Sequence, residues 1–284
     1  MGILLSMGEE GVSLLQDALD IWNDYYTKII SILTTSPEDL YSGVWNAMKT
    51  INNYLSAIGV VLVVIFFYIG LTKTVIKLEE LKRPANFLGL FIRLALAVAV
   101  VANSSQLLLK IMEIIQGCIV GISNLFGGFG TTGQVTAVPN EIVTLAREAG
   151  WATGLGIWAL SLIGAILIWL VSLIMLLLVY MRFFKIYIYI AIAPLPLATL
   201  SGETTERTAR SFLMTFIGAC MQGVIIAIAF IIFVKVVNTG FSVDSSKGIA
   251  SIIFSYIGTI FMQLLLLVIT VRASEKTVRD IIGG

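Results

Sequence analysis

Residues 182–210 read RFFKIYIYIAIAPLPLATLSGETTERTAR, and this stretch decides how the chain can be arranged in a membrane. The uncharged run from Ile186 to Leu200 would rise about 22 Å as a straight helix, which is less than the hydrocarbon core of about 30 Å. Pro194 and Pro196 interrupt the run, because proline lacks an amide hydrogen and its ring clashes with the preceding helical turn. We therefore expect a broken or re-entrant segment at 186–200 instead of a straight span.

The residues before the two prolines strengthen this expectation. Ala193 and Leu195 are pushed away from helical angles by the proline ring that follows each of them. Non-helical backbone at membrane depth persists only where protein or a water-filled cavity surrounds it. The segment is therefore the strongest candidate for a functional element, with Pro194 and Pro196 as fixed bends or as a hinge.

The composition of the chain indicates an all-α, polytopic membrane helix bundle. Of the 284 residues, 58% are hydrophobic and 12% are charged, and the mean hydropathy is +0.99. The lack of histidine excludes His-based metal sites, catalytic triads and proton relays. A literal G-x-G-x-x-G at 128–133 is not interpreted as a nucleotide site, because no strand and no βαβ unit surround it. We expect no catalytic, metal or cofactor site, and hence no enzyme.

Five full-length spans are expected beside the broken segment. They are placed at about 54–72, from near 87 past 102, near 156–181, at 211–237 and at 249–271.

An amphipathic helix is expected at 9–33, ahead of the first span. Its acidic residues fall on one face, and its apolar stripe consists of Leu15, Leu19, Trp22, Tyr26, Ile29 and Leu33. The acidic polar face favours a protein partner over the surface of an anionic membrane. Ser36 and Pro37 then mark a further helix start, with serine as N-cap and proline at the first helical position.

The distribution of lysine and arginine predicts the topology. If 186–200 does not cross the membrane, the N-terminus is outside, the C-terminus is inside, and eleven basic residues are cytoplasmic against six external. If the segment crosses, the division becomes eight against nine. The positive-inside rule therefore favours five spans with the N-terminus out and the C-terminus in.

This topology divides the chain into five regions. They are external N-terminal amphipathic helices at 1–53, the first two spans with a basic cytoplasmic connection at 54–109, a long external loop at 110–155, spans three to five with the broken segment and the cytoplasmic loop 182–210 at 156–271, and a cytoplasmic tail at 272–284.

Residues 182–199, an arginine-led apolar stretch that ends in an alanine-proline step, resemble the TrbL family (the VirB-six-like family), and most of all its compact members from conjugative elements of Gram-positive bacteria. The resemblance implies a membrane channel or scaffold subunit of a type IV secretion system, which carries out conjugative DNA transfer across the bacterial cytoplasmic membrane. It also implies homo-oligomers that contact a VirB-type ATPase, bitopic scaffold proteins, and the transferred DNA or nucleoprotein.

Four basic residues flank the broken segment, and they are Arg182, Lys185, Arg207 and Arg210. As a cytoplasmic collar in an assembled ring they would touch the ATPase or the phosphate backbone of DNA, and such contacts are sensitive to salt. The simpler interpretation is that they only anchor the topology.

Arg93, Gln222 and Gln263 are the candidate pore or interface residues within the predicted spans. Arg93 either snorkels to the near interface or lines a pore. Gln222 and Gln263 are expected to form interhelical hydrogen bonds, with a place at a pore or interface as the other interpretation.

Two other functions compete with the channel subunit. A secondary transporter for a small solute would also use broken helices at membrane depth, although no intramembrane Asp or Glu offers a coupling site and no internal repeat is visible. A membrane scaffold without a pore would instead bind its partners through the external loop and the amphipathic N-terminal region.

Overall fold

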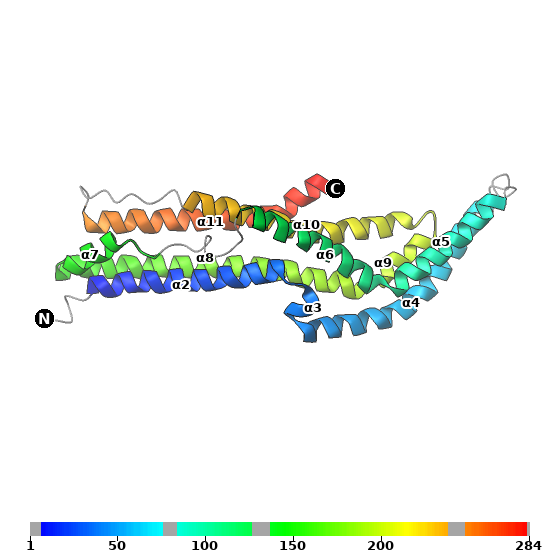
Figure 1. Cartoon of the computed structure of the whole chain (residues 1–284), viewed down its shortest axis with the longest axis horizontal. Helices are drawn as coiled ribbons and strands as arrows, with labels where there is room; N and C mark the ends of the chain where they lie inside the picture. Colours follow the sequence, from blue (N-terminus) through cyan, green and yellow to red (C-terminus); the bar gives the residue numbers. More distant parts are fainter. Residues whose placement is uncertain (1–6, 76–83, 127–136, 238–247, 283–284) are drawn as a thin grey trace. The chain divides into compact units, whose positions relative to one another are not determined.

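The computed structural model describes residues 7–75, 84–126, 137–237 and 248–282, and the regular structure in these ranges is helical throughout, which confirms the all-α prediction. The basic connection at 77–83 and the glycine motif at 128–133 lie outside the described residues. In chain order (Figure 1), the helices are α2 (Met7–Thr34), α3 (Pro37–Leu40), α4 (Ser42–Val75), α5 (Pro84–Ala102), α6 (Ser104–Leu125), α7 (Asn140–Glu148), α8 (Trp151–Ile192), α9 (Pro194–Ala198), the 3-10 turn η2 (Thr199–Ser201), α10 (Glu206–Val237) and α11 (Ile249–Ile282).

The described residues form two compact units. Unit 1 is drawn from Met1–Thr34, Ile119–Tyr180 and Ile225–Ser274. Unit 2 is drawn from Thr35–Cys118, Met181–Val224 and Glu275–Gly284. Helices α6, α8, α10 and α11 each contribute residues to both units. The broken segment as the structure shows it, which we define from here on as residues 193–205, lies within unit 2.

Within the described residues, five helices are long and apolar enough to cross a membrane, which is the predicted number, and they are α4, α6, α8, α10 and α11. The second of them differs from the predicted one. Where we expected a single span from near 87 past 102, the chain bends at Asn103 and forms α5 and then α6. The described apolar part of α5, Leu88–Ala102, is shorter than a span, whereas α6 has the required length.

Helix α6 begins before residue 110 and occupies the first part of 110–155, which we interpreted as a loop. Within α6, Lys110 Nζ lies 2.7 Å from the carboxylate of Glu113 one turn later, so these two charges neutralise each other. The side of the membrane to which 110–155 belongs stays a prediction.

Helix α8 is unbroken for 42 residues, about twice the ~20 that a span needs. Residues 186–192 therefore continue a helix, and the predicted interruption is confirmed at Ala193, between the end of α8 and the start of α9. The physical reason is that a proline disturbs the helical turn immediately before it, so Pro194 leaves residues further upstream helical.

The apolar stripe predicted on 9–33 is buried in unit 1, with each of its six side chains at most 2% exposed. The Trp22 ring meets Phe233 edge-to-face with the centroids 5.7 Å apart, and Tyr26 meets Phe230 in the same way at 5.4 Å. Part of this stripe thus packs against α10 of the same chain.

Replacement of Gly11 by valine should destabilise unit 1. A Cβ at Gly11 would lie 2.8 Å from Cα of Trp158 on α8, so the backbones of α2 and α8 would have to separate. We expect a loss of about 1–3 kcal/mol, measured by thermal unfolding of the detergent-purified protein. The control is Gly117→Ala, since a Cβ there meets no atom within 4 Å. Equal melting temperatures for the two variants would contradict this packing.

Candidate functional site

The broken segment consists of one helix end, two short helical pieces and a turn. Helix α8 ends at Ile192, α9 begins at Pro194, η2 ends at Ser201, and Gly202 is extended with φ −101° and ψ 131°. The prediction that Ala193 is non-helical is wrong, because its φ and ψ are −50° and −39°. Leu195 is also helical, within α9.

The prolines tolerate this geometry because of their position. Pro194 stands at the first position of α9, where an amide hydrogen has no partner within the helix and where the fixed φ of proline suits a helix. Ala193 is fully buried and its carbonyl accepts a hydrogen bond from Leu197 N at 3.1 Å. Burial and this bond outweigh the steric bias that a following proline imposes.

The carbonyl that Pro194 leaves without a helical donor is bonded by another helix. In an uninterrupted helix, the amide of residue 194 would donate to the carbonyl of Ile190. Here Asn52 Nδ2 of α4 donates to Ile190 O at 2.6 Å. An unsatisfied carbonyl at membrane depth costs several kcal/mol, so this buried amide removes a large penalty.

Asn52 also bonds the second helix break of unit 2. Its Nδ2 lies 3.1 Å from Oγ of Ser104, the first residue of α6, and the Ser104 hydroxyl lies 3.2 Å from Asn52 Oδ1. Asn52 is 2% exposed and Ser104 is fully buried. One amide side chain therefore ties the break between α5 and α6 to the break between α8 and α9.

Helix α4 continues this support along one stripe, which we name the α4 seam. Its members recur at intervals of four and three residues, which places them on one helix face, and they are Asn52, Ser56, Gly59, Val63, Phe66 and Gly70. Ser56 Oγ donates to Val101 O near the end of α5 at 2.8 Å.

The rest of the α4 seam meets the broken segment through backbone groups. A Cβ at Gly59 would lie 2.8 Å from Cγ1 of Val101 and 3.0 Å from the carbonyl oxygen of Pro194, so a larger residue would require these neighbours to shift. The carbonyl of Val63 accepts a hydrogen bond from Ser201 Oγ at 2.8 Å. A Cβ at Gly202 would lie 2.7 Å from the carbonyl oxygen of Phe66, which explains a glycine at this turn.

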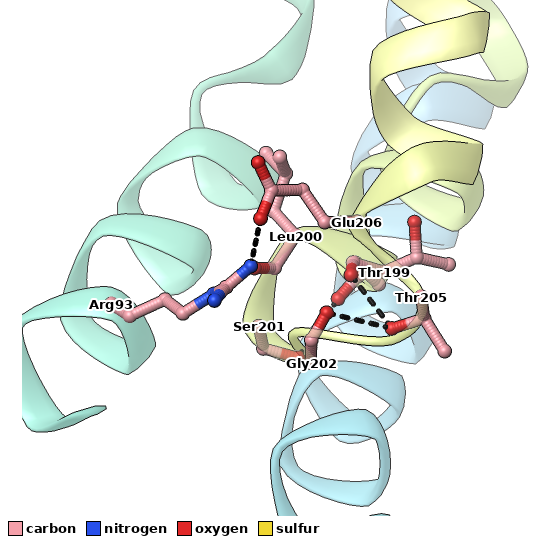
Figure 2. Close-up of polar contacts among 8 residues, drawn as sticks. Arg93, Thr199, Leu200, Ser201, Gly202, Thr205 and Glu206 are labelled. Atoms are coloured by element: carbon pink, nitrogen blue, oxygen red, sulfur yellow. Dashed lines mark hydrogen bonds and ion pairs between the residues drawn. The ribbon is translucent and has the colours of Figure 1, made fainter. Parts of the chain in front are cut away.

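The far end of the broken segment is held by Arg93 and by a local turn (Figure 2). Arg93 Nε donates to the carbonyl of Leu200 at 2.9 Å, and its guanidinium forms an ion pair with Glu206 at the start of α10. The Thr205 hydroxyl lies 2.9 Å from the carbonyl oxygen of Thr199, across the same turn. Arg93 thus fastens the chain on both sides of the turn.

Arg182 is fully enclosed in unit 2, with 3% of its surface exposed. Its Nε donates to the carbonyl of Ala219 at 3.0 Å and its Nη2 to that of Cys220 at 3.1 Å, both on α10. Gly223 makes room for the guanidinium, since a Cβ there would lie 2.6 Å from Cζ of Arg182. Arg182 is therefore buried, and its charge does not face outward from this chain.

The other three basic residues expected in the collar are accessible. Arg207 and Arg210 are exposed on the first turns of α10. Lys185 Nζ lies 3.0 Å from the carboxylate of Glu275 on α11, and the lysine side chain is 40% exposed.

The two glutamines fall in different units. Gln222 lines a pocket of unit 2 together with Lys185, and Gln263 is half-buried on α11 in unit 1. Their interhelical hydrogen bonds stay a prediction. Among the described residues, no group of three or more Cys, Asp or Glu side chains is close enough to hold a metal ion.

Sequence reasoning missed four residues that hold the break, namely Asn52, Ser104, Ser201 and Glu206. A signal was present for Asn52, because an amide beside an apolar span needs an interior partner. Nothing in the sequence indicated which carbonyl this partner would be, since Ile190 lies 138 residues further along the chain.

Comparison with known protein families matches residues 22–194, more than half of the chain, to the family described as TrbL/VirB6 plasmid conjugal transfer like protein. No curated protein and no solved structure matches the chain. The matched region contains α4, α5, α6 and α8, and it ends at Pro194, the first residue of α9.

Asn52→Ala should destabilise the protein by about 1–3 kcal/mol, because the Ile190 carbonyl and the Ser104 hydroxyl lose a buried partner. The matched control is Asn53→Ala, whose side chain is exposed on the same helix. Thermal unfolding in detergent measures both variants.

The same interaction predicts a coupling between Asn52 and Pro194. Pro194→Ala restores an amide hydrogen that can bond the Ile190 carbonyl, so Asn52→Ala should cost less in that background than in the wild type. Additive losses in this double-mutant cycle would contradict the role assigned to Asn52.

Proposed function

Because the chain belongs to the TrbL/VirB6-like family of plasmid conjugal transfer proteins, we propose that this multi-pass membrane protein forms part of the path along which a type IV secretion machine moves DNA or nucleoprotein across the bacterial cytoplasmic membrane. The observation that carries the proposal is the proline break at Pro194. The carbonyls of Ile190 before it and Leu200 after it accept hydrogen bonds from side chains of two other helices. Energy for transfer would come from partner ATPases.

The polar groups at the break support a role as a fixed bend in a conduit. Irregular backbone at membrane depth occurs where protein or a water-filled cavity surrounds it. Asn52 bonds the segment near its start, Ser201 bonds it to α4, and Arg93 bonds it near its end. Such anchoring positions the segment and leaves little freedom for a swinging hinge, so we favour fixed bends for Pro194 and Pro196.

An assembled ring fits the surface of unit 2. Five span-capable helices in one chain offer few residues to enclose a wide aqueous path, so a conduit would need several copies. Helices α4 and α5 expose large apolar side chains, among them Tyr54, Val61, Tyr68, Leu88 and Leu96. These surfaces would contact lipid, further copies, or bitopic scaffold subunits.

We propose a collar with fewer residues than the four expected from the sequence. Arg207 and Arg210 are its exposed members and would contact the ATPase or the phosphate backbone from each copy, whereas Lys185 is partly engaged by Glu275. Family membership favours this channel role over the secondary transporter, which the broken helix alone also allowed.

Replacement of both prolines in the broken segment tests the fixed bend. Pro194→Ala with Pro196→Ala restores the two missing amide donors, so the carbonyl of Ile190 can bond within the helix. This would loosen the anchoring by Asn52 and shift the turn at 199–205. We expect conjugative transfer, measured as mating frequency with the variant as the only copy, to fall about tenfold or more because the turn is misplaced. Pro139→Ala, in the connection before α7, is the matched control. Wild-type transfer by the double variant would show that the bend is incidental.

Neutralisation of the exposed arginines tests the collar. Arg207→Gln with Arg210→Gln should reduce transfer while leaving membrane insertion intact, because the lost contacts are made to a partner and not within the chain. Lys110→Gln is the control, since this lysine is exposed and is predicted to lie on the other side of the membrane. Unchanged transfer in the double variant would show that both arginines only fix the orientation of the chain in the membrane.

A further inference from the structure

A pocket of about 360 Å³ lies in unit 2 between α8, the first half of α10 and the C-terminal part of α11. It is separate from the proline break, because none of its lining residues belongs to α4, α5, α9 or η2. The proposed path of DNA or nucleoprotein does not require it. Its charged and apolar lining residues nevertheless indicate that it binds one particular class of ligand.

The charged groups at the pocket leave an excess of positive charge. Lys185 Nζ lies 3.0 Å from Oε1 of Glu275, and Arg279 Nη2 lies 3.6 Å from the same oxygen. Two cations therefore share a single carboxylate, which can neutralise only one of them. Arg279 is the looser partner, with its side chain 72% exposed. An anion that entered the pocket would find both cations within one site.

Neutral polar groups stand beside these charges. The Gln222 side chain lines the pocket and carries an amide with two donor hydrogens. Tyr189 also lines the pocket, and its ring is set edge-to-face against Phe212 and Phe216 with centroids 6.0 Å and 6.5 Å apart. Such donors match the several acceptor oxygens of a phosphate group.

Apolar side chains also line part of the pocket and form the surface beside it. Met214 and Val278 line the pocket from α10 and α11. On α8, Ile188 and Ile192 are exposed one and two turns after Lys185, on the same helix face. These side chains belong to span-capable helices and form an apolar surface that leads away from the cations. A ligand with a phosphate head and hydrocarbon tails fits this arrangement.

We propose that the pocket binds the headgroup of an anionic phospholipid, with phosphate between Lys185 and Arg279 and acyl chains along Ile188 and Ile192. Basic pockets between membrane helices bind anionic headgroups by this combination of charge and hydrocarbon contact. A nucleic-acid strand is disfavoured, because the apolar surface beside the cations offers nothing to a chain of phosphates.

The test measures lipid retained by the purified full-length protein in native mass spectrometry, with phosphatidylglycerol and phosphatidylcholine of identical acyl chains as probes. The wild type should retain phosphatidylglycerol in preference to phosphatidylcholine. Lys185→Gln and Arg279→Gln should each weaken phosphatidylglycerol binding about fivefold. Lys276→Gln, an exposed lysine on α11 that does not line the pocket, should leave binding unchanged.

Glu275→Gln distinguishes a binding site from a merely structural ion pair. Loss of the carboxylate frees both cations, so this variant should bind phosphatidylglycerol more tightly, whereas a structural role would lower binding or leave it unchanged. Equal retention of the two lipids by the wild type would overturn the proposal. It would also fail if Lys185→Gln and Arg279→Gln behaved like Lys276→Gln.

Competition identifies the source of the phosphate. Glycerol phosphate, the headgroup without tails, should displace phosphatidylglycerol only weakly. Displacement as strong as that by the intact lipid would instead make this a site for a free phosphate compound, and displacement by a short single-stranded oligonucleotide would assign it to DNA. These measurements do not use DNA transfer, so they succeed or fail independently of the proposed conduit.

Discussion

The structure of unit 2 depends on the hydrogen bond between Asn52 and the carbonyl of Ile190. A proline in a membrane helix always leaves one carbonyl without its helical donor, and the hydrocarbon provides no water to replace that donor. A buried amide from α4 meets this requirement and at the same time bonds Ser104 at the other helix break. The arrangement of α4, α5, α6, α8 and α9 around the broken segment therefore follows from one requirement. Each backbone carbonyl that a helix break leaves without its amide donor needs a hydrogen bond from another group.

The same requirement explains how a positive charge is accommodated among apolar helices. Within the part of the chain that the structure describes, Arg182 donates hydrogen bonds to the carbonyls of Ala219 and Cys220. A carbonyl oxygen in a helix has a second lone pair, so these groups can bond Arg182 and keep their helical amides. Gly223 supplies the space, and the guanidinium therefore joins α8 to α10.

The sequence predicted those features that depend on local chemistry. The break follows from Pro194, the buried stripe of α2 follows from its periodicity, and the cap by Ser36 follows from the serine-proline step, where its hydroxyl accepts from Asp39 N at 3.2 Å. Features that depend on distant residues were not predictable. The partner of Asn52 lies 138 residues away and that of Arg93 lies 113 residues away. The burial of Arg182 depends on an absent side chain at Gly223, which no charge pattern reveals.

The α4 seam has a consequence for how this chain can change in length. Its members contact the broken segment at both ends, with Asn52 near the start of the break and Phe66 beside the turn at Gly202. One residue inserted between them would rotate the following part of α4 by about 100°. Either Asn52 or Phe66 would then leave the interface, and no single substitution could restore both. A whole heptad would keep the face of α4 aligned but would lengthen the helix by about 10 Å and again separate one end from its contact. We therefore expect this helix to vary in residue type far more readily than in length.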